Sequence, residues 1–259
     1  MRFVRYQVGQ NAPAFGWLYE DRVGALEGSP FAEYRRLEAE SPLSAVRLLA
    51  PVVPGKIICV GRNYVEHAKE LDNPVPEIPL LFLKPPSAVI GPGQRIVLPP
   101  QSNQVDHEAE LVAVIGRRGR WITPDRASQH VLGYTCGNDV TARDLQRRDG
   151  QWTRGKGFDT FCPLGPWIDT EFDPTDALIT CRVNDEMRQM GSTREMVFSV
   201  AQLIAYASSI MTLEPGDIIM TGTPAGVGPL EAGNTVEVSI EGLGDLRNPV
   251  VSEEIERRV

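Results

Sequence analysis

Three acidic residues alternate in the segment 105–116, and their spacing indicates a cation site. Asp106, Glu108 and Glu110 precede an apolar, β-branched run typical of a buried strand. Because strand side chains alternate between faces, the three carboxylates face one region. At ~6–7 Å and an effective dielectric of about 20, each adjacent ionised pair costs about 2–3 kcal/mol. A cation would remove that repulsion, and oxygen-only ligands favour Mg²⁺ or Mn²⁺ over zinc. The alternative is the solvated face of an edge strand.

A histidine and a glutamate form a second candidate group. The segment 65–71 has a short helical pattern, and the spacing of His67 and Glu70 places both on one helical face. There the carboxylate can orient the imidazole and stabilise its charge. The alternative is an ordinary surface pair.

Further candidate site residues lie at the end of a predicted strand, on a predicted helix and between two glycines. Asp139 follows a predicted strand and is either a site residue or a helix cap. Helical propensity over 141–148 places Arg143 and Gln146 on one face. Lys156 lies between two glycines, where the backbone can approach a ligand, although most such lysines are surface residues.

The elements that must position these residues divide the chain near residue 52. Residues 1–52 form a small β appendage, with strands at 3–8, 15–19 and 23–26 and a helical composition at 31–49. Residues 53–259 form the main domain, and its proline-rich loop 72–79 is a candidate mobile lid.

Other elements of the main domain follow from periodicity and turn residues. They are helices at 124–130 and 196–211, a hairpin turn at 184–185, a strand at 235–240, and a final strand before a charged tail. The glycines of 218–228 lack the Lys-Ser/Thr end of a phosphate loop, and no G-x-G-x-x-G occurs, which argues against nucleotide binding.

Composition narrows the function classes. The 259 residues are 42% hydrophobic and carry a formal net charge of −8, which argues against nucleic acid or an anionic membrane as the main partner. Neither a signal peptide nor a transmembrane run is predicted, so the expected location is the cytoplasm. The four cysteines are widely spaced and are expected to be reduced, buried thiols.

Five blocks in order resemble the fumarylacetoacetate hydrolase family over residues 54–250. They are G-R-N-Y-x-x-H-x-x-E at 61–70, D-H-E-A-E-L at 106–111, G-N-D-V-T-A-R-D-L-Q at 137–146, K-G-F-D-T-F-C-P-L-G-P at 156–166 and T-G-T-P-A-G-V-G at 221–228. The resemblance implies an α+β, mainly β fold with a mixed β-sheet roll, and a homodimer.

The resemblance also implies residue roles. Glu108, Glu110 and Asp139 match the metal ligands, and Asp106 is expected to support them from behind. His67 and Glu70 match a dyad that activates water from a lid helix, and Lys156 matches a lysine that faces the substrate oxygen. The matches for the substrate pocket are Arg62, Arg143, Gln146 and Thr223.

The implied chemistry is metal-dependent cleavage of 2-oxo acids through an enolate, with Mg²⁺ or Mn²⁺. The dyad favours hydrolysis of an acylpyruvate-like substrate. The alternatives are decarboxylation of the oxaloacetate type and isomerisation or decarboxylation of 2-hydroxyhepta-2,4-diene-1,7-dioate. A non-catalytic binding protein with the same fold is the hypothesis from another class.

Overall fold

The computed structural model describes residues 1–254, and strands dominate it. At 44% strand and 17% helix, it confirms the α+β, mainly β prediction. The strands are β1 Arg2–Gln7, β2 Ala14–Tyr19, β3 Arg22–Gly28, β4 Tyr34–Pro42, β5 Arg47–Leu49, β6 Ile57–Gly61, β7 Leu80–Lys84, β8 Val89–Ile90, β9 Ile96–Leu98, β10 Val105–His107, β11 Ala109–Ile115, β12 Val131–Asn138, β13 Thr141–Ala142, β14 Cys162–Asp169, β15 Leu178–Val183, β16 Glu186–Ser192, β17 Ile218–Met220, β18 Gly228–Pro229, β19 Thr235–Ile240 and β20 Gly244–Ser252. The α-helices are α1 Val65–Glu70, α2 Arg143–Asp149, α3 Thr153–Lys156 and α4 Val200–Ile210, and the 3₁₀ helices are η1 Leu43–Ala45, η2 Pro86–Ala88, η3 Pro124–His130 and η4 Thr193–Glu195.

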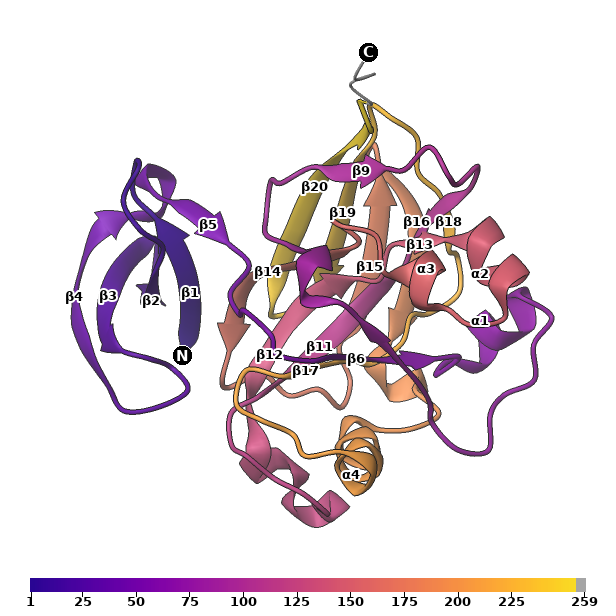
Figure 1. The fold of residues 1–259 in the computed structure, drawn as a ribbon. Coiled ribbons are helices and arrows are strands. Elements are labelled where there is room, and N and C mark those ends of the chain that lie inside the picture. Colours follow the sequence, from indigo (N-terminus) through magenta and orange to yellow (C-terminus); the bar gives the residue numbers. More distant parts are fainter. Residues whose placement is uncertain (255–259) are drawn as a thin grey trace.

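One large mixed sheet runs through the molecule in the order β4-β3-β2-β1-β14-β12-β11-β17-β6-β7. Strands β1–β5 form a lobe beside the main body (Figure 1), and pairing of Arg2 with Asp169 and of Phe3 with Ile168 joins β1 to β14. A five-stranded sheet, β16-β15-β19-β20-β9, and a three-stranded sheet, β13-β10-β18, complete the body. Helices α1, α2 and α3 gather on the side of the body away from the lobe. The division of the chain near residue 52 stays a prediction.

Strand β11 is buried on both faces, which explains its uninterrupted apolar sequence. Leu111, Ala113 and Ile115 belong to the core shared with the five-stranded sheet, where they join residues of β15 and β19. Val112 and Val114 belong to a second core on the opposite face, with residues of β6, β14 and β17. A strand held in this way gives the residues at its beginning a rigid support.

The predicted single strand over 105–116 is two strands in the structure. The ladder breaks at Glu108: β10 pairs with β13 and β18, whereas β11 pairs with β12 and β17. Glu108 bridges the break, since its backbone N–H donates to Asn138 Oδ1 and its carbonyl accepts from the N–H of Asp139. The acids are buried, so the alternative of a solvated edge strand is wrong.

The helical prediction for 31–49 is wrong. Residues 34–42 form β4, which pairs with β3 through a ladder with irregular register, and β5 pairs with β1. This pairing overrides a composition that carries few strand signals, because β4 is an edge strand with mostly exposed side chains. Residues 124–130, which were predicted to be helical, form a 3₁₀ helix rather than an α-helix. The helix predicted at 196–211 starts later, because Ser199 caps α4.

Most other predicted elements are confirmed. They include the strands β1, β2, β3 and β19, the helices α1 and α2, and the turn at Asn184 and Asp185 between β15 and β16. All four cysteines are free and buried, as expected. Residues 72–79 contain neither helix nor strand, and their role as a mobile lid stays a prediction. Among the helices of residues 1–254, none is both long and apolar enough to cross a bilayer. The charged tail predicted after the last strand lies partly outside the described residues.

Candidate active site

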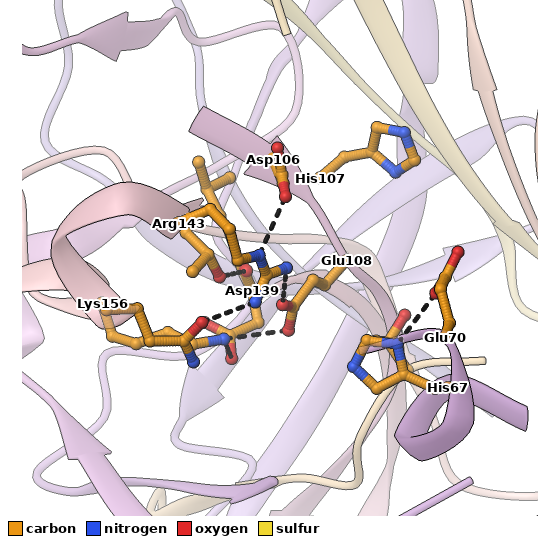
Figure 2. Close-up of polar contacts among 12 residues, drawn as sticks. His67, Glu70, Asp106, His107, Glu108, Asp139, Arg143 and Lys156 are labelled. Carbon is orange, nitrogen blue, oxygen red and sulfur yellow. Dashed lines mark hydrogen bonds and ion pairs between the residues drawn. The ribbon is translucent and has the colours of Figure 1, made fainter. Parts of the chain in front are cut away.

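A cavity of about 450 Å³ opens where β11 begins and where α1, α2 and α3 meet. Glu108, just before β11, and Asp139 converge there with side chains from the three helices (Figure 2). All but one of the predicted site residues line it. They are Arg62, His67, Glu108, Glu110, Asp139, Arg143, Gln146, Lys156 and Thr223. The remaining one, Glu70, contacts His67.

Three buried carboxylates form the centre of this cavity. One oxygen from each of Glu108, Glu110 and Asp139 lies within 4.8 Å of the others, and none of these residues is more than 4% exposed. Glu110 accepts a hydrogen bond of 2.8 Å from the N–H of Gly222. A Cβ at residue 222 would lie 2.8 Å from the Asn63 side chain, so glycine permits this close approach.

Cationic side chains surround two of the three acids. Lys156 Nζ lies 2.9 Å from Glu108 Oε2 and 2.6 Å from Asp139 Oδ2. The Arg143 guanidinium bridges Glu108 and Asp106, so Asp106 contacts the cluster through Arg143. Its supporting role stays a prediction. Within residues 1–254 no cationic side chain forms an ion pair with Glu110.

The charges on the cluster suit an added divalent cation. Burial raises the pKa of Glu110 well above its usual range, and the negative charges of Asp139 and Glu108 raise it further. Burial has the same effect on Glu108, but Lys156 and Arg143 outweigh it and hold the pKa of that carboxyl well below its usual range. An ion among three carboxylate oxygens would offset the penalty on ionised Glu110. The donor set is oxygen only, which fits Mg²⁺ or Mn²⁺.

The histidine and glutamate of α1 face this cluster as a pair. His67 Nδ1 lies 3.3 Å from Glu70 Oε2, and Glu70 also accepts a hydrogen bond of 3.0 Å from the N–H of Gly226. Burial lowers the pKa of His67, although Glu108 and Glu70 oppose that shift. His67 is therefore neutral near pH 7. With Nδ1 turned to Glu70, Nε2 is available to accept a proton.

Helix α2 places two pocket residues on one face, as its spacing predicts. Arg143 Nη1 donates to Gln146 Oε1 over 2.6 Å, and Arg143 is only 2% exposed. The loop after β17 contributes Thr223, which is equally buried. Arg62 follows β6 with a φ of +59° and lines the cavity.

Sequence reasoning missed three residues that hold the acids in place. Lys84, at the end of β7, is 2% exposed and donates to Asp139 Oδ1 over 2.5 Å and to the carbonyl of Val140 over 3.1 Å. Asn138 fixes the backbone of Glu108, and Gln189 of β16 contacts both the acidic strand and Thr223. Of these three residues, only Lys84 stands out in the sequence, because it is a charged residue that directly follows the apolar run 80–83.

Together, the mainly β fold and this pocket place three buried acids, in an arrangement suited to a divalent ion, beside buried cationic side chains. The sequence matches the family model "Fumarylacetoacetate (FAA) hydrolase C-terminal" over residues 56–251. The chain belongs to the fumarylacetoacetate hydrolase family. Residues 1–51 match a second model, "Rv2993c-like, N-terminal".

Several relatives are similar over most of the chain. Human "Oxaloacetate tautomerase FAHD2A, mitochondrial" is 49% identical over 84% of this chain and 74% of that protein. Protein Rv2993c of Mycobacterium tuberculosis is 51% identical over 81% of this chain and 80% of its own length. A solved structure of 5-carboxymethyl-2-hydroxymuconate delta-isomerase from Mycobacterium smegmatis superposes with a TM-score of 0.92 at 45% identity, covering 98% of this chain and all of that one.

Proposed function

We propose that this protein is an Mg²⁺- or Mn²⁺-dependent enzyme that cleaves 2-oxo acids through an enolate, with hydrolysis of an acylpyruvate-like C–C bond as its reaction. The observation that carries this proposal is the burial of Glu108, Glu110 and Asp139 in the cavity that His67 also lines. A buried acid cluster alone would suit a structural ion. A neutral histidine beside it adds a base.

The chain's own residues have distinct roles in this reaction. Glu108, Glu110 and Asp139 would hold the ion, which when bound supplies a Lewis acid toward the carboxylate and 2-oxo oxygen of the substrate. Burial lowers the pKa of Lys156, but the charges of Asp139 and Glu108 outweigh that effect and raise the pKa above its usual value. Lys156 therefore stays charged and donates to the developing enolate oxygen. Arg143 holds Glu108 in place through its ion pair.

His67 carries the proton transfer. Its Nε2 takes a proton from water as the water oxygen bonds to the acyl carbon, while Glu70 accepts from Nδ1–H and stabilises the imidazolium. The bond from the acyl carbon to C3 then breaks, and its electron pair forms the enolate. Return of the proton from His67 to C3 gives a carboxylic acid and a shorter 2-oxo acid.

A second candidate reaction is tautomerisation or decarboxylation of oxaloacetate. Arg62 and Arg147 line the same cavity, and within residues 1–254 neither forms an ion pair with an acid. Two such cations suit a second carboxylate on the substrate. The name of the human relative is in line with this reaction, and isomerisation of 2-hydroxyhepta-2,4-diene-1,7-dioate would use the same enolate and the same cationic end.

Replacing Arg147 by Gln tests whether Arg62 and Arg147 bind a second carboxylate of the substrate. We expect KM for oxaloacetate to rise ~10-fold, because a charge-assisted hydrogen bond to the second carboxylate is lost. KM for acetylpyruvate, which lacks that group, is expected to stay within about twofold. Arg148→Gln is the matched control, since Arg148 is an exposed neighbour on α2 and does not line the cavity. Equal effects on the two substrates would argue against a carboxylate site at Arg147.

A thermal-shift measurement tests ligand binding apart from turnover. Mn²⁺ with oxalate, each at ~100 times its dissociation constant, is expected to stabilise the fold by about 2.7 kcal/mol or more, a rise of ~5–10 °C in Tm. Assays with acetylpyruvate, oxaloacetate and 2-oxohept-3-enedioate in the presence of Mg²⁺ then identify the reaction. A shift without turnover on any of these acids would favour the non-catalytic binding protein.

We also propose that the chain forms a homodimer. Strand β7 ends the order of the large sheet, and Leu80, Leu83 and the nearby Ile78 are exposed there, Ile78 to 63%. Apolar side chains at an open sheet edge are suited to a protein contact. Sedimentation equilibrium is expected to give twice the chain mass of 28.5 kDa, and Leu83→Lys is expected to weaken the association. A native protein that stays monomeric at micromolar concentrations would contradict the proposal.

A further inference from the structure

We propose that Gln189 is a positioning residue that turns the hydroxyl hydrogen of Thr223 into the cavity, so that Thr223 donates to the carboxylate end of the bound 2-oxo acid. The inference rests on the proposed function for its ligand class. Gln189 lies on β16, outside the cavity lining, and is only 1% exposed. Its side chain connects the acidic strand to the glycine-rich loop after β17.

The orientation of the Gln189 amide is fixed at both of its ends. Its Oε1 lies 3.0 Å from the backbone N–H of Ala109, which can only donate. Its Nε2 lies 2.8 Å from the carbonyl of Pro224, which can only accept. These two contacts agree, so the oxygen faces the acidic strand and the NH₂ group faces the loop.

The second amide hydrogen decides the direction of the Thr223 hydroxyl. Nε2 lies 2.7 Å from Thr223 Oγ1, and an amide NH₂ can only donate, so Oγ1 accepts. The hydroxyl hydrogen must therefore point elsewhere. Thr223 lines the cavity, and within residues 1–254 its hydroxyl has no acceptor. A carboxylate oxygen of the ligand is the acceptor that suits this position.

His107 supports the same arrangement from the other face of the acidic strand. Its ring is turned away from Glu108 and Lys156 (Figure 2), and it is fully buried. Nδ1 lies 3.0 Å from Gln189 Oε1, which already accepts from Ala109, so Nδ1 carries the hydrogen and donates. Gln189 is thus held by two donors and two acceptors, and its amide has no free rotation.

A double-mutant cycle on oxalate binding tests this role. The dissociation constant of oxalate is measured by calorimetry in the presence of Mn²⁺ for the native chain, Thr223→Val, Gln189→Glu and the double variant. A glutamate at 189 keeps an acceptor for Ala109 and His107, but it carries at most one hydrogen, and Pro224 needs that one. The Thr223 hydroxyl then donates to residue 189 and presents only lone pairs to the ligand.

We expect Thr223→Val and Gln189→Glu each to weaken oxalate binding ~10-fold, and the double variant to bind no more weakly than either one. If Gln189→Glu acted only by repelling the anion, it would raise the dissociation constant of oxalate by the same factor with threonine or valine at 223. A double variant whose loss of affinity is the product of the two single losses would therefore overturn the inference. Gln129→Glu adds an equal charge at an exposed position and is expected to leave oxalate binding unchanged.

A second variant keeps the test decisive if Gln189→Glu does not fold. Gln189→Met removes the donor without adding charge, which frees the Thr223 hydroxyl to rotate. Thr223→Val must then cost less, about threefold or under, than it costs beside Gln189, and an unchanged cost would overturn the inference. Failure of the native protein to bind oxalate with Mn²⁺ would instead reject the proposed function, and this inference with it.

Discussion

Replacing Glu110 by Gln is expected to lower metal-dependent turnover ~1,000-fold, because it removes a charged ligand and with it several kcal/mol of charge stabilisation. The same change is expected to raise the stability of the metal-free protein. Burial and the charges of Asp139 and Glu108 raise the pKa of Glu110 in the fold. The metal-free fold therefore loses stability as pH rises from the carboxyl's ordinary pKa toward its raised pKa in the fold, and a neutral amide has no such cost.

Two measurements distinguish this result from simple damage to the fold. Turnover is assayed with Mn²⁺, and Tm is recorded with EDTA at pH 7. Glu241→Gln, at an exposed position, is the matched control and is expected to change neither. A Glu110→Gln variant that keeps native turnover, or native activity in the presence of EDTA, would show that the acid cluster does not hold a catalytic ion.

Replacing His67 by Ala is expected to lower acylpyruvate hydrolysis by about 10³-fold, the usual contribution of a positioned general base. Decarboxylation of oxaloacetate is expected to lose far less, because release of CO₂ needs no attacking water. The native base is neutral at pH 7, since burial lowers its pKa. The ratio of the two rates therefore reports the water-activating role of His67 separately from the enolate chemistry.

Both reactions are measured with the same preparation, so differences in folding or metal content cancel. His130→Ala is the control, because His130 is a histidine on η3 that does not line the cavity and contacts the carbonyl of Arg117. Equal losses in hydrolysis and decarboxylation after His67→Ala would remove the assigned role of the His67–Glu70 pair. A smaller loss in hydrolysis than in decarboxylation would reverse it.

Local sequence patterns predicted the site better than they predicted the lobe of β1–β5. The i, i+3 spacing of His67 and Glu70 and the face shared by Arg143 and Gln146 are geometric rules within one helix, and the structure has both contacts. Of the alternating acids it brings together Glu108 and Glu110, although the strand breaks at Glu108. The family resemblance, and no local pattern, predicted that Asp139 and Lys156 lie beside Glu108 and Glu110. Lys156 lies 48 positions from Glu108 and 17 positions from Asp139 in the chain, and no rule of local spacing predicts contacts at such separations.

The errors arose where tertiary pairing outweighs local preference. Strand β4 is exposed along most of its length, so it lacks the alternation that marks a strand. Its pairing with β3 and the hydrogen bond from Trp17 Nε1 to the Leu37 carbonyl hold it in place. The break at Glu108 could not be predicted because it depends on Asn138 from another strand. Lys84 and Gln189 were missed for the same reason, since their partners lie 55 and 34 or more residues away.

Mn²⁺ binding followed by electron paramagnetic resonance tests the central claim most directly, because free and protein-bound Mn²⁺ give different signals. The claim is that Glu108, Glu110 and Asp139 together hold one divalent ion that is open to a 2-oxo acid. We predict one Mn²⁺ bound per native chain, a change in the bound signal when oxalate is added, and loss of that binding in Glu110→Gln. Equal Mn²⁺ binding by the native chain and the variant, or no response to oxalate, would contradict the account.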